Sequence, residues 1–281
     1  MKISVLVTVH NRFRLLRSNL LSLSYQSVKP DEVIISDDGS EEKIIELLRP
    51  LAEELPFKIK YVRQDHKGFR AARVRNNAAN ISSGALLIFL DQDIVGTHGF
   101  IETFAAGAIP GEFRVAWPIR LSDEQSNNVT DEILASGDFH SIITPMQRFK
   151  ISKQFRKELF YSWLHSIRLR KFGSKLRSGL FSIFREDYFK VNGFDEMYRG
   201  WGNEDDDLGR RLHVAGIQGS NPFYREYPLH LYHEPNRRGE ERPNLGYYEQ
   251  RVSEINGGDY RCRYGVENPL EDEILHKVEL G

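Results

Sequence analysis

Short apolar segments alternate with helical patterns through the first hundred residues, and this order most restricts the folds available to the chain. Runs rich in Ile, Val and Leu, typical of buried parallel strands, lie at 3–9, 32–36, 59–62 and 85–90. Segments with helical character separate them, at 13–27, 41–55 and 71–82. Because parallel strands need right-handed crossovers, this order predicts an α/β fold with a Rossmann-like, mostly parallel sheet flanked by helices.

Polar side chains follow three of these strands at the point where each strand ends. Ligands bind at the carboxyl ends of the strands in sheets of this kind. A single polar cluster there is usually turn chemistry, but three clusters at one sheet edge indicate a binding site. The clusters are Thr8, His10 and Asn11 after the first strand, Asp37 and Asp38 after the second, and Asp91 and Asp93 after the fourth.

Asp91 and Asp93 flank Gln92 directly after a buried strand, so their carboxylates can reach one point. Oxygen ligands of this kind suit Mg²⁺ or Mn²⁺. A cation held there could neutralise the charge that develops on a departing diphosphate. Carboxylates that only cap a turn are the alternative, and the position after the run 85–90 favours the metal hypothesis.

Residues 200–212, with the sequence GWGNEDDDLGRRL, place four consecutive acids before two arginines. A helix with acids in its first turn and arginines in its last turn accounts for part of this pattern. A spacing of four residues predicts two ion pairs along such a helix, Asp206 with Arg210 and Asp207 with Arg211. Glu204 and Asp205 have no basic residue three or four positions further along the chain, so local pairing does not explain them.

Glu204 and Asp205 closely follow Trp201, which two glycines flank. An indole ring is a platform for the face of a sugar, and a carboxylate can act as a base toward a hydroxyl. Crowded like charges and partial burial would raise a carboxyl pKa toward the useful range. The segment therefore predicts a sugar-binding and catalytic element.

His230 and His233 lie three residues apart in the run LHLYHEPN. This spacing places both rings on one face of a helical turn, or near each other in a loop. A lone histidine is usually structural, but this pair could complete a shell of oxygen and nitrogen ligands with the acidic cluster. Nitrogen ligands favour Mn²⁺ over Mg²⁺.

The alternation of strands and helices fades after about residue 108. Residues 122–137 are polar and predict a loop, and residues 146–177 are strongly basic with Glu158 as the only acid. Apolar side chains recur every four positions in the basic segment, at Ile151, Phe155, Leu159, Trp163 and Ile167. The pattern predicts an amphipathic helix. It either packs on the domain with a solvated basic face or contacts a membrane surface or an anionic acceptor.

Charge and hydropathy exclude several classes of protein. The formal net charge of -1 gives no global attraction to nucleic acid, so no such partner is expected. The longest uninterrupted apolar run, 85–90, is far too short to cross a membrane, and no signal-peptide cleavage pattern follows residues 1–9. The single cysteine, Cys262, excludes an intramolecular disulfide and favours a reducing compartment. A cytoplasmic protein is expected, soluble or peripheral at the inner face of the membrane.

The first hundred residues contain the runs VLVTVHNR, IISDDGS and RNNAANISSGALLIFLDQD. In type and spacing they resemble family-2 glycosyltransferases of the GT-A fold. The later run VNGFDEMYRGWGNEDDDLGRRL, followed by HLYHEPN, resembles the catalytic region of the β-1,4-galactosyltransferase group and related bacterial enzymes. The resemblance covers most of 3–101 and 179–237, is weak in 110–178 and after 245, and offers no counterpart to 146–177. The Golgi anchor of animal members is absent, which favours a bacterial cytoplasmic enzyme.

The resemblance implies a role for each candidate site residue. A uridine and diphosphate pocket would be lined by Thr8, His10, Asn11 and Arg12, with Asp37 and Asp38 reaching the uracil or ribose. The donor would also meet Arg75, Asn76, Asp91 and Gln92. Mn²⁺ or Mg²⁺ would be held by Asp93 and His233, with His230 as a further candidate ligand. The acceptor would bind Trp201, Gly202 and Glu204, and the base of an inverting transfer would be Asp205.

The implied activity is inverting transfer of a hexose or N-acetylhexosamine from a UDP-sugar to a glycan or lipid-linked glycan, in polysaccharide or glycolipid biosynthesis. A retaining transferase, a non-catalytic nucleotide-sugar or glycan-binding module and a metallohydrolase are the alternatives. The expected parts are a nucleotide-sugar-binding half (1–110), a variable basic segment (111–178), an acceptor-binding catalytic half (179–245) and a C-terminal extension (246–281). The donor sugar, the acceptor, the linkage and the oligomeric state stay open.

Overall fold

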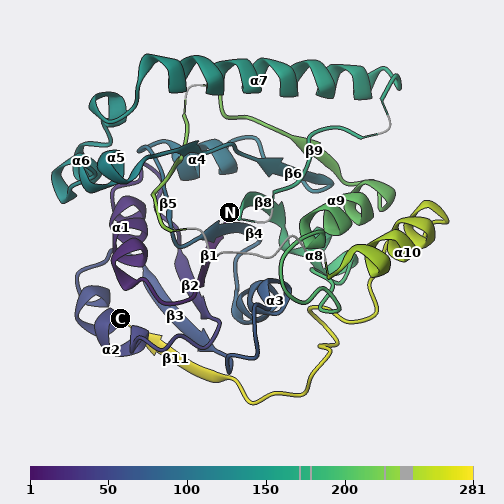
Figure 1. The fold of residues 1–281 in the computed structure, drawn as a ribbon, viewed down its shortest axis with the longest axis horizontal. Coiled ribbons are helices and arrows are strands. Elements are labelled where there is room, and N and C mark those ends of the chain that lie inside the picture. Colours follow the sequence, from purple (N-terminus) through teal and green to yellow (C-terminus); the bar gives the residue numbers. More distant parts are fainter. Residues whose placement is uncertain (171, 178, 225, 235–242, 281) are drawn as a thin grey trace.

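The main sheet of the protein runs through the centre of the molecule with helices on both faces (Figure 1). The computed structural model describes residues 1–170, 172–177, 179–224, 226–234 and 243–280. Within this part of the chain the strand order of the main sheet is β11-β3-β2-β1-β4-β8-β6-β9. The α/β fold class predicted from the sequence is confirmed.

The parallel half of the sheet consists of four strands from the first ninety-one residues. They are β1 (Ile3–Val9), β2 (Glu32–Asp37), β3 (Lys58–Arg63) and β4 (Leu86–Asp91). Each lies within one residue of its predicted bounds. In register, Val9 of β1 pairs with Asp37, and Thr8 pairs with Asp91. The polar residues that end these strands therefore meet at one edge, as the sequence predicted.

The remaining strands come from the second half of the chain and mix directions. They are β6 (Glu112–Val115), β8 (Leu180–Phe184), β9 (Gln218–Ser220) and β11 (His276–Leu280). Strand β8 runs antiparallel to β4. Strand β11 forms one edge of the sheet and runs antiparallel to β3. A second, small sheet contains β5 (Ile94–Val95), β7 (Ile119–Arg120) and β10 (Leu229–His230).

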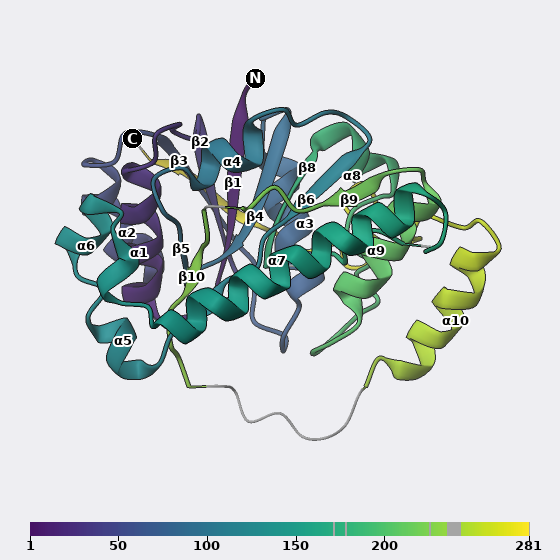
Figure 2. The same cartoon turned by 90° about the horizontal axis from the view of Figure 1, so that it is seen from above.

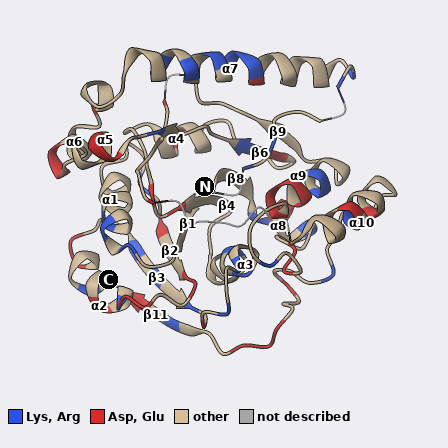
Figure 3. Ribbon diagram, in the orientation of Figure 1, with Lys and Arg blue, Asp and Glu red and all other residues tan. Residues whose placement is uncertain are grey.

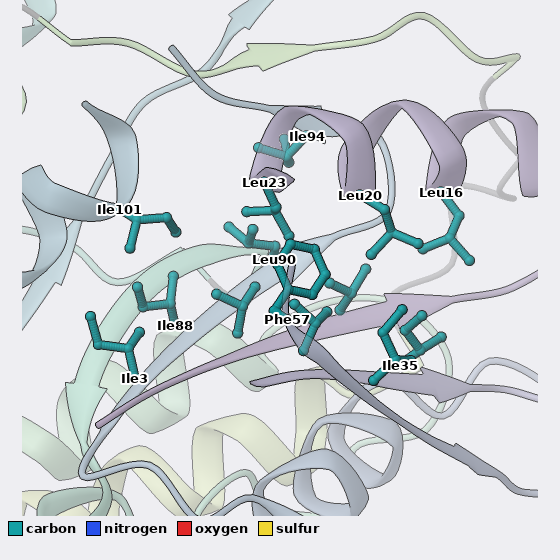
Figure 4. Close-up of a cluster of buried hydrophobic side chains, with 14 of the residues drawn as sticks. Ile3, Leu16, Leu20, Leu23, Ile35, Phe57, Ile88, Leu90, Ile94 and Ile101 are labelled. Atoms are coloured by element: carbon teal, nitrogen blue, oxygen red, sulfur yellow. The ribbon is translucent and has the colours of Figure 1, made fainter. Parts of the chain in front are cut away.

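Alternate residues of the parallel strands build a core on each face of the main sheet. One core packs Val5, Val7 and the equivalent positions of β2 and β4 against α1 (Phe13–Ser24), α2 (Ile44–Ala52) and α4 (Phe100–Ala105), as Figure 4 shows in part. The other packs Leu6, Ile34 and Phe89 against α3 (Ala71–Ile81), α8 (Arg185–Lys190) and α9 (Glu204–Val214). Helix α10 (Leu245–Asn256) follows in the chain beside α9. Both faces of the parallel strands are therefore buried, and the polar residues lie at the ends of strands that are packed on both sides.

The predicted loop at 122–137 is wrong, because two short helices occupy it. They are α5 (Asp123–Asn127) and α6 (Asp131–Ser136), which the 3₁₀ helix η1 (Phe139–Ser141) follows. Ser122 begins α5 with a capping box, and the Thr130 side chain caps α6. Capped starts with acids in the first turn stabilise helices that a hydrophobic pattern alone does not reveal.

The basic segment forms the long helix α7 (Pro145–Ser166), which runs along one side of the molecule (Figure 2). The apolar stripe predicted at every fourth residue does not stay on one face, because a step of four residues advances about 40° around an α-helix. Phe155 is buried, whereas Leu159, Trp163 and Ile167 are exposed. No helix in the described part of the chain has both the length and the apolar character needed to cross a membrane.

Candidate active site

A cleft of about 750 Å³ opens at the carboxyl ends of β1 and β4. It collects residues that the sequence places more than two hundred positions apart. The predicted residues in its lining are Thr8, His10, Asn11, Arg12, Asp38, Arg75, Asp91, Gln92, Asp93, Trp201, His230 and His233. Most of the predicted site residues therefore share one cavity.

One wall of the cleft is a tight turn after β1. Asn11 and Arg12 have φ angles of 55° and 60°, the left-handed region, which turns the chain sharply into α1. Glu42 accepts hydrogen bonds from the backbone N–H groups of Arg12 and Phe13, so its carboxylate supplies the cap that Arg12 does not provide. The Asn11 amide oxygen accepts from the N–H groups of residues 41 and 42. These bonds fix the wall before any ligand binds.

His10 and Asp38 form the next part of this wall. The His10 ring stacks on His66 with centroids 4.6 Å apart, and both Nδ1 atoms lie within hydrogen-bonding distance of the Asp38 carbonyl oxygen, at 3.2 and 2.9 Å. The Asp38 carboxylate accepts from Gln64 and from the Arg70 N–H. Burial raises the pKa of Asp38, although these hydrogen bonds oppose the shift.

Asp91 is held in a fixed orientation at the end of β4. Its Oδ1 accepts hydrogen bonds from Thr8 Oγ1 at 2.9 Å and from Arg75 Nη2 at 3.1 Å. Its Oδ2 lies against Gly179, where an added Cβ would come within 2.0 Å of that oxygen. Any side chain at this position would displace the carboxylate, which explains glycine there. The two hydrogen-bond donors and the close contact with Gly179 thus hold the Asp91 carboxylate in place at the cleft.

Asp93, His230 and His233 form the candidate metal centre. Asp93 Oδ2 lies 3.1 Å from His233 Nε2 and 3.7 Å from His230 Nε2, and one ligand atom from each residue lies within 4.8 Å of the others. The small sheet brings them together, because β5 begins just after Asp93 and pairs with β10, which ends at His230. The hydrogen bond to Asp93 raises the pKa of His233.

The residues of this centre fit a divalent cation. Asp93 Oδ1 is buried, and it has no hydrogen-bond partner among the residues that the structure describes. A buried carboxylate oxygen without a donor is costly and is a position where a cation binds favourably. One carboxylate with two imidazoles is a mixed oxygen and nitrogen donor set, which suits Mn²⁺ better than Mg²⁺.

Helix α9 confirms the pairing predicted for its first two turns. Asp206 lies 2.7 Å from Arg210, and Asp207 lies 2.6 Å from Arg211, with both members of the second pair completely buried. Asp205 has no ion-pair partner predicted by this spacing, and it is partly exposed. Among the described contacts, its Oδ1 accepts one hydrogen bond, from the N–H of the next residue, Asp206, at 2.9 Å.

Glu204, the other carboxylate that local pairing did not explain, has a partner on a different helix. Its Oε1 lies 3.8 Å from Arg75 Nη1, and Arg75 also holds Asp91. Burial raises the pKa of Glu204, and the positive charge of Arg75 offsets part of that shift. Arg75 therefore couples the start of α9 to the end of β4.

Asp37 and Asn76 do not line the cleft. The buried Asp37 carboxylate accepts from the Ser40 N–H and hydroxyl and from the Tyr61 hydroxyl. Asn76 donates to the Phe194 carbonyl and to Glu196, and accepts from the Tyr188 hydroxyl. Both side chains are engaged in internal networks.

Three further predicted residues, Gly202, Glu204 and Asp205, are not among the residues that line the cleft, although they closely follow Trp201, which does. The end of the HLYHEPN run, Pro235 and Asn236, lies outside the described residues. Phe69, Arg120 and Tyr232 also line the cleft, and the sequence reasoning missed them. Tyr232 could have been inferred from its place between the two histidines, whereas no local pattern marks Phe69 or Arg120.

Comparisons with known proteins match the chain to glycosyltransferases. The model of glycosyl transferase family 2 matches residues 4–190, and the model described as the N-terminal domain of galactosyltransferase matches residues 159–234. The chain is 30% identical over 231 residues to validoxylamine A glucosyltransferase of Streptomyces hygroscopicus subsp. limoneus. The matched region covers 76% of this chain and 48% of that protein. It is 25% identical over 298 residues to chondroitin synthase of Pasteurella multocida (strain Pm70), covering 99% of this chain and 29% of that protein.

The fold is also found among solved structures. The crystal structure of GalNAc-T7 with UDP, GalNAc and Mn²⁺ matches with a TM-score of 0.59 at 19% identity, over 92% of this chain and 50% of that chain. The fold and the position of the cleft define a glycosyltransferase-type α/β protein of the GT-A class. The chain belongs to glycosyl transferase family 2. It spans about half the length, or less, of the curated relatives above.

Proposed function

We propose that the protein is a metal-dependent inverting glycosyltransferase that moves a hexose or N-acetylhexosamine from a UDP-sugar to a hydroxyl of a glycan or lipid-linked glycan. The observation that carries this proposal is the cluster of Asp93, His230 and His233 in the same cleft as Asp91. Membership of family 2 and relatives named as glucosyltransferase and chondroitin synthase support it. The proposed product is a polysaccharide or glycolipid made at the inner face of the membrane.

In the proposed reaction, Asp205 accepts the proton of an acceptor hydroxyl. The acceptor oxygen then forms a bond to the anomeric carbon of the donor, and the bond from that carbon to the diphosphate oxygen breaks on the opposite side. The configuration inverts in this single displacement. Asp93 and His233, with His230, would hold Mn²⁺, which supplies positive charge beside the diphosphate.

Other residues in the cleft and beside it orient the two substrates. The rigid wall of His10, Asn11 and Asp38 is proposed to bind the uridine, and Asp91 the ribose or donor sugar. The exposed indole of Trp201 offers a flat apolar surface to the acceptor sugar. Glu204 is proposed to hold acceptor hydroxyls, with Arg75 keeping its carboxylate aligned to Asp91.

A donor screen tests the proposal. The purified protein is incubated with UDP-glucose, UDP-galactose and their N-acetyl forms, with Mn²⁺ or EDTA, and UDP release is measured. We expect release with at least one donor in Mn²⁺ and its loss in EDTA. A retained anomeric configuration in the product would identify a retaining transferase, and UDP binding without release from any donor would favour a non-catalytic binding module.

A further inference from the structure

The outward face of α7 combines large apolar side chains with cations. Phe149, Phe160, Trp163 and Ile167 are between 44% and 61% exposed, and the Phe160 and Trp163 rings stack with centroids 5.9 Å apart. Monomeric proteins seldom expose so many large apolar side chains on one helix without a partner that covers them. We call the stripe formed by Phe149, Lys153, Arg156, Phe160, Trp163 and Ile167 the outer stripe.

The outer stripe has a helical repeat and a single sign of charge. Its six residues follow one another at intervals of three or four, so the five within α7 lie on one side of the helix, and Ile167 follows them as the C-cap residue. Lys153 and Arg156 are exposed within it, and Lys150 and Lys157 are exposed along one flank. The only acid of the helix, Glu158, points the other way and is buried at 5% exposure. Figure 3 shows Lys and Arg grouped on the central turns of α7. The exposed side of the helix therefore carries large apolar side chains, and its charged side chains are all Lys or Arg.

We propose that the outer stripe binds the surface of a bilayer that contains anionic lipid, with α7 lying in the plane of the interface. Trp and Phe side chains enter the boundary between headgroups and acyl chains, and the nearby Lys and Arg side chains are attracted to the anionic headgroups. A second copy of the chain is a poor occupant, because a symmetric contact through this face would place cations against cations.

The helix is anchored to the cleft at its first turn. Gln147 donates a hydrogen bond of 3.0 Å to the carbonyl oxygen of Arg120, whose side chain lines the cleft, and Gln125 donates to Gln147 at 3.0 Å. At the far end, the His165 ring forms a hydrogen bond with the Gln218 side chain of β9. A bilayer bound to the outer stripe would therefore hold the cleft at a fixed distance from the lipid surface. This suits a lipid-linked acceptor, a consequence that rests on the proposed function.

Vesicle sedimentation tests the inference. The full chain is mixed with vesicles of phosphatidylcholine alone or with phosphatidylglycerol added. We expect binding only when phosphatidylglycerol is present and weakening as salt rises. The double variant Phe160→Ser, Trp163→Ser should bind at least about tenfold more weakly, a change of about 1.4 kcal/mol. Leu47→Ser, at an apolar residue of α2 that is 45% exposed, is the control and should bind like the unchanged chain.

The outcomes separate this inference from the proposed function. The double variant should keep UDP release in the absence of vesicles, whereas Asp205→Asn should lose transfer and still bind vesicles. Equal vesicle binding by the double variant and the unchanged chain, or no binding to phosphatidylglycerol vesicles, would overturn the inference. A dimer that the double variant converts to a monomer would instead assign the outer stripe to contact between copies.

Discussion

Among the candidate site residues, Asp93 has the surroundings that most directly indicate a cation-binding position. Its Oδ2 faces two imidazoles, and its Oδ1 is buried without a donor among the described residues. Asp93→Ala should abolish the part of UDP affinity that depends on Mn²⁺, which calorimetric titration of UDP with and without the metal measures. Asp131→Ala, on the exposed surface, is the control. Unchanged UDP affinity in Mn²⁺ would contradict the assignment.

The sequence predicted some residue contacts and missed others for a physical reason. The Asp206 and Asp207 ion pairs follow from the spacing of four residues within one helix. Asn76 has partners from positions 188–196, and Asp37 bonds to Tyr61 on another strand, so no local pattern could reveal that these two are internal. The Glu204 contact with Arg75 was hidden for the same reason.

At the scale of a helix, the two ion pairs of α9 should contribute differently to stability. The Arg211–Asp207 pair is completely buried, and Arg211 also donates to two backbone carbonyls. Arg211→Met removes the close ion pair of the buried Asp207, which keeps the Tyr198 hydroxyl and Arg251 at 3.9 Å, and should lower the free energy of unfolding by about 3–5 kcal/mol. Arg210→Met, at a partly exposed pair, should cost about 1 kcal/mol or less. Urea unfolding measures both, and equal losses would show that the buried network is misassigned.

The first turn of α9 also sets a pH dependence of stability. Burial by itself raises the pKa of Asp206, but hydrogen bonds from Tyr248 and Arg210 and the nearby Lys175 outweigh it and lower the pKa to about 2. The unfolded chain protonates this group near pH 4, so its contribution of about 2 kcal/mol is present above that pH and is lost as the pH falls toward 2. Asp206→Asn should flatten the stability profile in this range. A profile identical to that of the unchanged chain would refute this role.

Secondary structure was predictable where the pattern repeats within one segment. Strands β1 to β4 are rich in Ile, Val, Leu and aromatic residues, and their bounds were correct to one residue. Helices α5 and α6 are too short for an apolar period and depend on capping instead. The stripe of α7 was misread because its inward residues, such as Phe155 and Glu158, follow the 3.6-residue period rather than a period of four.

At the scale of the molecule, the second half of the sheet could not be read from the sequence. Strands β6, β8 and β11 pair with neighbours far away along the chain, and only the tertiary structure selects them. The parallel half was predictable because each strand precedes its own crossover helix. The candidate site is divided in the same way. Its donor side comes from the predictable parallel half, whereas the small sheet brings His230 and His233 to the site.

Strand β11 closes one edge of the main sheet and gives a test of the whole fold. It covers β3 through an antiparallel pairing from His276 to Leu280, and Leu280 is buried. Deleting residues 275–281 should lower the free energy of unfolding by about 2 kcal/mol and promote self-association through the exposed edge. Urea unfolding and size-exclusion chromatography measure these effects. If the shortened chain unfolds and elutes like the unchanged chain, β11 does not stabilise or protect the β3 edge of the sheet.

The central claim is that Asp205 removes the acceptor proton in a metal-dependent transfer. The decisive measurement compares Asp205→Asn with Asp206→Asn, the adjacent structural aspartate, for UDP affinity and for glycosyl transfer to the best acceptor. We predict that Asp205→Asn lowers transfer by at least about a hundredfold while UDP affinity in Mn²⁺ stays within about twofold, and that Asp206→Asn keeps most of both. Near-normal transfer by Asp205→Asn would contradict the account.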